Sequence, residues 1–209
     1  MASYAASKMK LFMDNPLKKA VINYDDSFSD TLKTIIDNEK LYGFQYQNAR
    51  QTHQNNKKII RCTRIDCNLS HTTLHCHINQ EKYSFKSTLL TENQGKNLLT
   101  AISTLYALDM PIKKIQTITP TLKGVPGRTM LITNPSQIYC MVDYAHTPDA
   151  LRQTLSSLKN MISGKIFCIF GCGGERDTSK RAHMGQIAEQ FADHIIITDD
   201  NPRSEDPKL

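Results

Sequence analysis

Side chains able to bind or hold charged groups are concentrated in three loops after residue 140. These loops are residues 143–148 (DYAHTP), 171–177 (GCGGERD) and 199–203 (DDNPR). Glycines let a backbone approach a ligand closely and leave N–H groups available to an anion. Arginine forms paired hydrogen bonds with carboxylates and phosphates. The residue types therefore predict a site for a small ligand that carries carboxylate or phosphate groups.

Each loop also has a purely structural interpretation. The segment GCGGERD is neither a GxxxxGK[ST] phosphate loop, which occurs nowhere in the chain, nor a GxGxxG fingerprint, so it could be only a tight turn. DDNPR could be a turn begun by Asn-Pro, or it could place Arg203 on a carboxylate and Asn201 on an amine or carboxylate. Asp143 could accept hydrogen bonds from ribose hydroxyls and His146 could contact a nucleotide, although a lone loop histidine can equally be structural.

Lys8 is a further candidate because of its place on the first expected helix, residues 4–13. It shares a face with Ala5, Leu11 and Phe12 at helical spacing. Burial lowers the pKa of a lysine, and the neutral amine can react with carbon dioxide to form a carbamate. The alternative is a lysine at the rim of the helix whose amine extends to solvent.

The apolar pattern predicts the elements that position these residues. Before residue 124 we expect a helix over 4–13, a strand over 20–23, a helix from Phe28, antiparallel strands within 41–88, a helix over 96–108 and a short helix after Pro111. After the Gly/Pro-rich residues 124–127, strands 136–142, 165–170 and 194–198 alternate with helices 149–161 and 179–191. That alternation predicts parallel β-α-β units, whose ligands bind at the carboxyl ends of the strands, where all three loops fall.

Composition and charge narrow the class of protein. The 209 residues are 39% hydrophobic and 22% charged, as in ordinary globular proteins. No apolar run approaches the ~20 residues of a membrane helix, and the start lacks the pattern of a signal peptide, so we expect a cytoplasmic protein without membrane contact. Residues 1–124 hold 17 Lys/Arg against 10 Asp/Glu. Because these cations are scattered and match no nucleic-acid-binding signature, we expect a solvated surface and no nucleic acid, with a basic binding module as the alternative.

The six cysteines are expected to be reduced thiols, since no export signal accompanies them. The usual ligands of zinc, cysteine and histidine, occur close together in the chain at Cys62, Cys67, His71, His75, Cys76 and His77. However, TTLHCHI alternates as a strand does, which would send His75 and His77 to one face and Cys76 to the other. This alternation favours a plain hairpin over a zinc site.

The motifs together resemble a known family. VDYAHTPDAL, FGCGGERDTSKR and TDDNPR, in this order and spacing, are similar to the Mur ligases of peptidoglycan synthesis, most of all to their diaminopimelate-adding branch. YAASKMKLF and VINYDD resemble the central ATPase domain of that family, and GVPGR resembles the start of its C-terminal domain. The resemblance implies an α/β fold, with residues 1–124 as part of the central domain without its phosphate loop and residues 125–209 as the first part of a Rossmann-like C-terminal domain.

The resemblance also implies roles for individual residues. Lys8 corresponds to the carbamylated lysine that holds Mg²⁺. The nucleotide-binding positions of the family fall on Asn97, Arg128, Asp143 and His146. The amino-acid-binding positions fall on Arg176, Asp200, Asn201 and Arg203. The DNPR form is typical of diaminopimelate-adding members, since diaminopimelate has one carboxylate more than lysine and an arginine is its natural partner.

The implied reaction is amide formation driven by ATP with Mg²⁺. The D-glutamyl carboxylate of a UDP-N-acetylmuramoyl-dipeptide would be phosphorylated and then attacked by an amine of meso-diaminopimelate. The chain departs from the family at residues 91–97 (TENQGKN), where a GxFNxxN pattern is expected, and it lacks a later GKGHE-type segment. We therefore expect a monomeric internal fragment that is inactive alone. A lysine-adding or folylpolyglutamate-type ligase, or a non-catalytic basic remnant, are the alternatives.

Overall fold

The chain divides into two compact units, residues 1–123 and 124–209. The computed structural model describes residues 2–46, 58–132 and 138–206. Each unit is built around its own buried residues. None of the described helices is long and apolar enough to cross a membrane.

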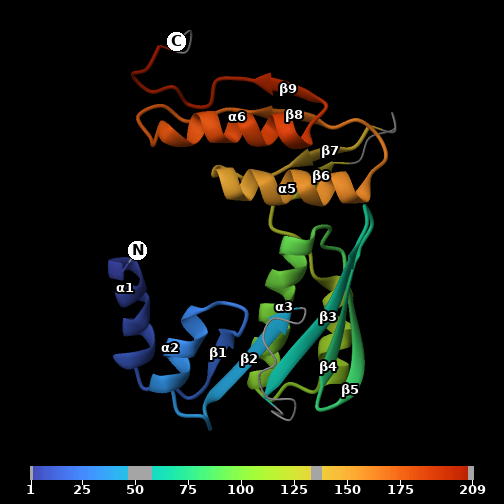
Figure 1. Cartoon of the computed structure of the whole chain (residues 1–209). Helices are drawn as coiled ribbons and strands as arrows, with labels where there is room; N and C mark the ends of the chain where they lie inside the picture. The colour runs from blue at the N-terminus through green and yellow to red at the C-terminus, as the bar shows by residue number, and fades with distance from the viewer. Residues whose placement is uncertain (1, 47–57, 133–137, 207–209) are drawn as a thin grey trace. The chain divides into compact units, whose positions relative to one another are not determined.

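The N-terminal unit is built on a five-stranded sheet with strand order β1-β2-β3-β4-β5 (Figure 1). Its strands are β1 (Ala20–Asn23), β2 (Leu41–Tyr46), β3 (Ile59–Cys67), β4 (Thr72–Ile78) and β5 (Glu81–Ser87). Its helices are α1 (Ala2–Met13), α2 (Phe28–Ile35), α3 (Glu92–Ala107) and α4 (Ile112–Ile118), followed by the 3₁₀ turn η1 (Thr119–Thr121).

Strand direction in this sheet is mixed. β3, β4 and β5 form the expected antiparallel meander, but β2 pairs in parallel with both β1 and β3. The prediction of an antiparallel sheet was therefore wrong for β2. The helix α2 returns β2 in the same direction as β1, and the connection from Tyr46 to Ile59 is long enough for β3 to run parallel to β2, whereas a tight hairpin would have made that pair antiparallel.

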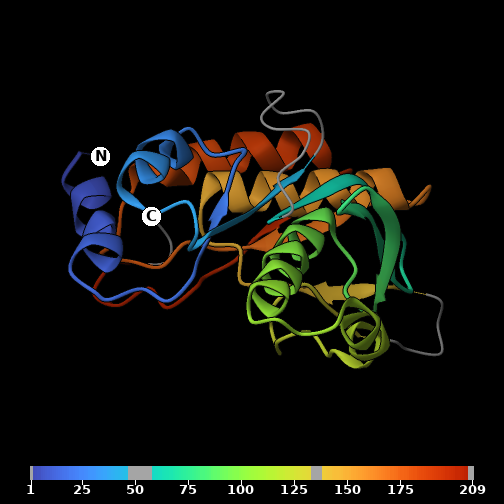
Figure 2. The same cartoon turned by 90° about the horizontal axis from the view of Figure 1, so that it is seen from below.

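The main core of this unit lies between the sheet and α3, which runs along one face of it (Figures 1 and 2). Leu99 of α3 packs in one cluster with Ile60, Leu74 and Phe85 of the sheet, and all four are fully buried. Thr91 caps the helix, since its hydroxyl accepts a hydrogen bond from the Gln94 N–H at 3.4 Å. This cap explains why α3 begins at Glu92, four residues before the expected start.

Within its described residues, 124–132 and 138–206, the C-terminal unit contains two short sheets and two helices. Its elements are β6 (Met130–Ile132), β7 (Cys140–Val142), α5 (Pro148–Met161), β8 (Phe167–Phe170), α6 (Ser179–Phe191) and β9 (His194–Ile197). β8 and β9, which precede and follow α6 in the chain, pair in parallel. This confirms the β-α-β unit predicted for residues 165–198. β7 was expected to belong to the same arrangement, but it pairs antiparallel with β6, because the few residues that join them are too short for a crossover.

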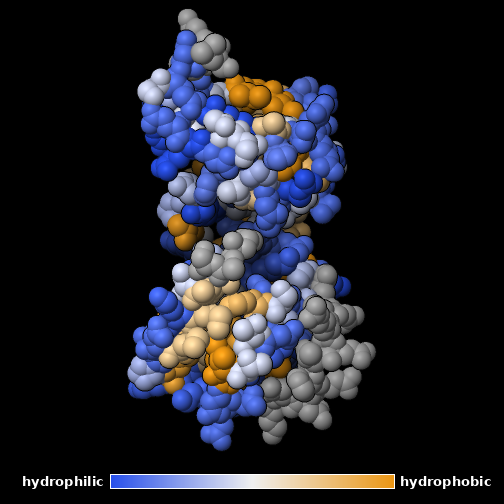
Figure 3. All heavy atoms as spheres, turned by 60° about the vertical axis from the view of Figure 1, so that its left-hand side comes forward, coloured by the Kyte–Doolittle hydropathy of each residue, from blue (hydrophilic) through white to orange (hydrophobic). Residues whose placement is uncertain are grey.

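The core of the C-terminal unit covers one face of β8. α5 and α6 lie side by side (Figures 1 and 2), and their Leu155 and Met184 bury Cys168 of β8. On the opposite face, Phe167 and Ile169 are 62% and 64% exposed. Figure 3 shows that hydrophobic atoms reach the surface of both units. Strands as apolar as β8 are typical of sheets buried on both faces. In this structure only one face of β8 is covered.

Candidate functional site

The glycine turn after β8 and the loop after β9 meet at the carboxyl ends of these two strands. A side chain at Gly174 would overlap the carbonyl oxygen of Pro202, and one at Gly171 would come within 2.9 Å of the Asp200 Cβ. The Gly174 N–H donates to the Asn201 carbonyl at 3.2 Å. Glycine is therefore required at these positions because the two loops touch through their backbones.

Arg203 lies against this glycine turn. Its Nη1 donates to the carbonyl oxygen of Gly174 and would be 3.2 Å from a Cβ at Gly173. Arg203 and Asn201 both adopt left-handed backbone conformations, with φ of +55° and +49°. Such conformations cost about 1–3 kcal/mol each in residues other than glycine. The loop therefore depends on its contacts with the glycine turn to keep this shape.

Arg176 and Asp200 lie on the two loops and complete the predicted amino-acid-binding group. Arg176 is exposed, and its Cγ is 3.9 Å from where a Cβ of Gly173 would stand. Among residues 2–46, 58–132 and 138–206, no hydrogen bond or ion pair involves the side chain of Arg176 or of Asp200. Both charged groups are thus available to a ligand at the glycine turn.

A cavity of about 490 Å³ opens beside these loops. Charged residues in its lining include Arg181, Asp199, Asp200, Glu205 and Asp206. Both signs of charge are present, as an amino acid with ammonium and carboxylate groups requires. Of the predicted amino-acid-binding residues, Asp200 lines the cavity, together with glycines of the turn. Arg176 and Arg203 do not line it.

Glu205, which the sequence motifs did not single out, joins the two loops to α6. Its carboxylate accepts hydrogen bonds from the Glu175 N–H and from Arg181 Nη2, each at 2.7 Å. These two donors, in that order of importance, hold the pKa of Glu205 below its ordinary value. In the same turn, the Ser179 hydroxyl and N–H donate to Asp177 and lower the pKa of that carboxyl.

The predicted nucleotide-binding residues of this unit form a second group around Tyr144. The guanidinium carbon of Arg128 lies 4.1 Å from the centroid of the Tyr144 ring, and the His146 ring lies 5.1 Å away on an edge. Lys180 donates to the His146 carbonyl at 2.8 Å. Asp143 accepts from the Thr129 hydroxyl at 2.6 Å. The structure thus brings these loop residues together; Tyr144, the ring on which two of them pack, gave no signal in the sequence beyond its place in the motif.

Lys8 and Asn97 lie in the N-terminal unit on different helices. Lys8 is exposed on α1, its amine 5.4 Å from the centroid of the Tyr4 ring, and Leu11 is 60% exposed. Of the two interpretations of Lys8, the structure agrees with a lysine at the rim of the helix and not with a buried apolar face. Only Phe12 of that face packs against the small cluster around α2. Asn97 is exposed on α3, opposite the residues that pack on the sheet.

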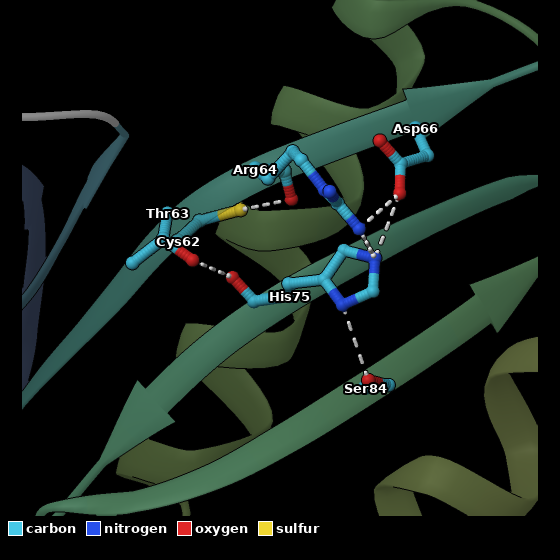
Figure 4. Close-up of polar contacts among 6 residues, drawn as sticks. All are labelled: Cys62, Thr63, Arg64, Asp66, His75 and Ser84. Atoms are coloured by element: carbon cyan, nitrogen blue, oxygen red, sulfur yellow. Dashed lines mark hydrogen bonds and ion pairs between the residues drawn. The ribbon is translucent and has the colours of Figure 1, made fainter.

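The cysteine- and histidine-rich hairpin contains a polar network around His75 (Figure 4). His75 Nε2 lies 2.9 Å from Asp66 Oδ2, which also pairs with Arg64 at 2.9 Å, and Ser84 Oγ is 3.4 Å from His75 Nδ1. Cys76 is buried on the other face, as the alternation predicted. In the part of the chain that the structure describes, no three His, Cys, Asp or Glu side chains gather as metal ligands would.

The α/β fold and these loops agree with two family models that together match most of the chain. Residues 1–105 match the Mur ligase middle domain, and residues 127–209 match the Mur ligase glutamate ligase domain. The chain therefore belongs to the Mur ligase family.

Individual relatives point to one branch. The chain is 36% identical to the UDP-N-acetylmuramoyl-L-alanyl-D-glutamate--2,6-diaminopimelate ligase of Prochlorococcus marinus and 38% identical to that of Xanthomonas campestris. The two matches cover 100% and 99% of this chain, but the chain spans only 42% and 41% of the length of these two relatives.

Solved structures show the same fold. A solved structure of a UDP-N-acetylmuramoyl-L-alanyl-D-glutamate--2,6-diaminopimelate ligase superimposes with a TM-score of 0.68 at 34% identity. The match covers 99% of this chain and 42% of that one. The folylpolyglutamate synthetase of Lactobacillus casei has a TM-score of 0.68 at 14% identity, over 98% of this chain and 49% of the other, which shows a shared fold alone.

Proposed function

We propose that the chain is part of an ATP-dependent ligase that joins meso-diaminopimelate to UDP-N-acetylmuramoyl-L-alanyl-D-glutamate. The relatives that support this proposal carry that name and match the whole chain. The observation that carries it is the position of Arg203 against the glycine turn, on one loop with Asp200 and Asn201. In domain terms, residues 1–124 would belong to the central domain and residues 125–209 to the amino-acid-binding domain.

The charges around the glycine turn suit diaminopimelate. This amino acid carries a carboxylate at each end, and Arg203 and Arg176 offer guanidinium groups to carboxylates. Asp200 and the Asn201 amide oxygen can accept hydrogen bonds from an ammonium group. Lysine lacks the second carboxylate, so it would leave Arg203 without a charged partner, and that loss is the basis for its rejection.

The group around Tyr144 suits a nucleotide. Arg128, His146 and Lys180 bring positively charged or hydrogen-bonding groups to one place, and the Asp143 carboxylate can accept hydrogen bonds from ribose hydroxyls. Within the N-terminal unit, Asn97 stays the proposed contact to adenine. When bound, ATP supplies the phosphoryl group that activates the substrate carboxylate.

The described residues do not by themselves make a magnesium site. A carbamate on Lys8 would supply one hard oxygen ligand of the kind that Mg²⁺ prefers. However, Lys8 is exposed and no cluster of acidic or histidine ligands accompanies it among the described residues. We therefore assign no step of the reaction to a metal held by this chain.

Calorimetric titration of the purified chain tests the amino-acid site. We expect meso-diaminopimelate to bind more tightly than L-lysine, and Arg203→Ala to weaken diaminopimelate binding about 10- to 100-fold, the worth of a charged hydrogen bond. Arg152→Ala is the matched control, because Arg152 bonds Gln190 on the helix surface at 3.0 Å, away from the loops. Equal affinity for both amino acids, or no effect of Arg203→Ala, would contradict the proposal.

The catalytic half of the proposal has its own test. The chain contains no GxxxxGK[ST] segment to hold the phosphates of ATP. We therefore expect no amide formation when the purified chain is mixed with ATP, Mg²⁺, the UDP-linked dipeptide and meso-diaminopimelate. Ligation detected by mass spectrometry would overturn this expectation.

A further inference from the structure

The loop after β9 is held at both ends, and only one end involves the predicted ligand-binding residues. Near its start, Asn201 and Arg203 bond the backbone of Gly174. Near its end, the Glu205 carboxylate bonds the Glu175 N–H and Arg181 Nη2. Glu205 therefore ties together three segments: its own loop, the glycine turn and the first turns of α6.

Arg181 makes this second attachment more than an exposed ion pair. Its Nε is buried and has no hydrogen-bond partner within the described residues, and its side chain is only 38% exposed. Glu205 is the carboxylate that compensates this partly buried charge. Both side chains of the pair keep more than a third of their surface exposed, so loss of that carboxylate should change the overall stability little while it releases the loop from α6.

The backbone of the loop explains why the attachment matters for binding. Asn201 and Arg203 both have positive φ, a conformation that non-glycine residues keep only when neighbouring contacts impose it. Arg203 belongs to the first attachment and lies close in the chain to Glu205, which makes the second. If the far end were released, the direction of the Arg203 guanidinium would no longer be fixed.

We propose that Glu205, acting through Arg181 and the Glu175 N–H, is a positioning residue that orients Arg203 toward the second carboxylate of the amino acid. This inference rests on the proposed function, since it concerns the same ligand. Both carboxylate oxygens of Glu205 are occupied by protein donors. Glu205 also lines the cavity, but because both of its oxygens are engaged by protein donors we assign its effect on the ligand to the orientation of Arg203.

Glu205→Gln is the sharpest test, because the amide can still accept a hydrogen bond from Glu175 but no longer carries the charge that pairs with Arg181. Glu189→Gln is the control, since Glu189 is an exposed glutamate on α6, the helix that carries Arg181. We expect Glu205→Gln to weaken meso-diaminopimelate binding about tenfold and to leave L-lysine binding unchanged, because only the diaminopimelate complex uses Arg203. Amide hydrogen exchange at Gly174 and Glu175 should become faster, with the thermal unfolding midpoint nearly unchanged.

A second variant checks the route through Arg181. If Glu205 acts through Arg181, Arg181→Met should weaken diaminopimelate binding by a similar factor. The double variant should then bind diaminopimelate no more weakly than whichever single variant has the lower affinity. Fully additive losses would contradict the coupling.

The outcomes separate this inference from the proposed function. If Arg203→Ala abolishes the preference for diaminopimelate but Glu205→Gln does not reduce it, the positioning role is wrong and the proposed function stands. If the unaltered chain does not distinguish the two amino acids, the proposed function fails. Amide hydrogen exchange at Gly174 and Glu175 then tests whether Glu205 holds the loop to the glycine turn. Unchanged exchange rates in Glu205→Gln overturn that role, and faster rates support it.

Discussion

The two units differ in what holds them in shape. The N-terminal unit has a large core in which Ile60, Phe85 and Leu99 are fully buried between α3 and the sheet. The C-terminal unit leaves one face of β8 open, yet it carries most of the proposed site residues on loops held by backbone contacts and a few charges. The comparison indicates that the C-terminal unit has the smaller core and that the shape of its loops depends on contacts between them.

The largest expected effect is the loss of a fully buried side chain in the N-terminal core. Leu99→Ala should lower the free energy of unfolding of that unit by about 2–5 kcal/mol. Leu155→Ala should cost the C-terminal unit less, because its core is smaller and can collapse more readily. Urea unfolding followed by residue-resolved NMR measures both units, with Leu108→Ala, 66% exposed, as the control. A larger loss from Leu155→Ala would break the comparison.

The next effect falls on the loops. In Gly174→Ala, the added methyl group would overlap the Pro202 carbonyl, so the two loops must separate. We expect the C-terminal unit to lose about 1–3 kcal/mol of stability, and diaminopimelate affinity to fall at least as far as in Arg203→Ala. Gly164→Ala is the matched control, since a Cβ there meets nothing within 4 Å. Unchanged affinity in Gly174→Ala would show that the loops need not touch to bind.

The sequence predicted the elements whose signals are local. The bounds of β1 and α6 follow from short apolar runs and helical spacing, and both were confirmed. The direction of β2 was predicted wrongly, because pairing depends on partners far away in the chain. For Lys8 the sequence left a buried face and a rim position both open, because spacing on a helix shows which residues share a face but not whether another element covers it.

The site was predictable to a similar extent. The rule that ligands bind at the carboxyl ends of parallel strands was enough to place the glycine turn and the DDNPR loop at one edge of the sheet. It did not indicate Glu205, whose role depends on a loop with two left-handed residues and on the position of Arg181. No motif encodes such a contact, since it arises only when the backbones of both loops are in place.

A smaller effect compares equivalent helix caps in the two units. Thr91 accepts a hydrogen bond from the Gln94 N–H at 3.4 Å, and Thr147 accepts one from the Ala150 N–H at 3.3 Å. Replacement of either residue by alanine should cost about 1 kcal/mol. Thr91 is buried and Thr147 is exposed, so water can replace the lost acceptor only at α5. Denaturant unfolding should therefore show the greater loss for Thr91→Ala; the reverse order would contradict this explanation.

The smallest effect is a pH dependence confined to the loop attachment. The Glu175 N–H and then Arg181 hold the pKa of Glu205 below its ordinary value of 4.5. A lowered folded-state pKa means that the attachment contributes its full stability above the unfolded pKa and loses it as the pH falls through the folded one. Amide exchange at Gly174 should therefore accelerate, relative to unstructured amides, as the pH falls below 4.5.

Glu205→Gln removes this titration, so the acid slope of its relative exchange rate should become smaller over the same range, while Glu189→Gln should follow the unaltered chain. Asp177 also has a lowered pKa in the same turn, held by Ser179. Its contribution survives in Glu205→Gln, so any slope left in that variant measures Asp177. If the variant keeps the whole slope, the acid sensitivity of the loop belongs to Asp177, and the charge on Glu205 is not what fastens the loop to the turn.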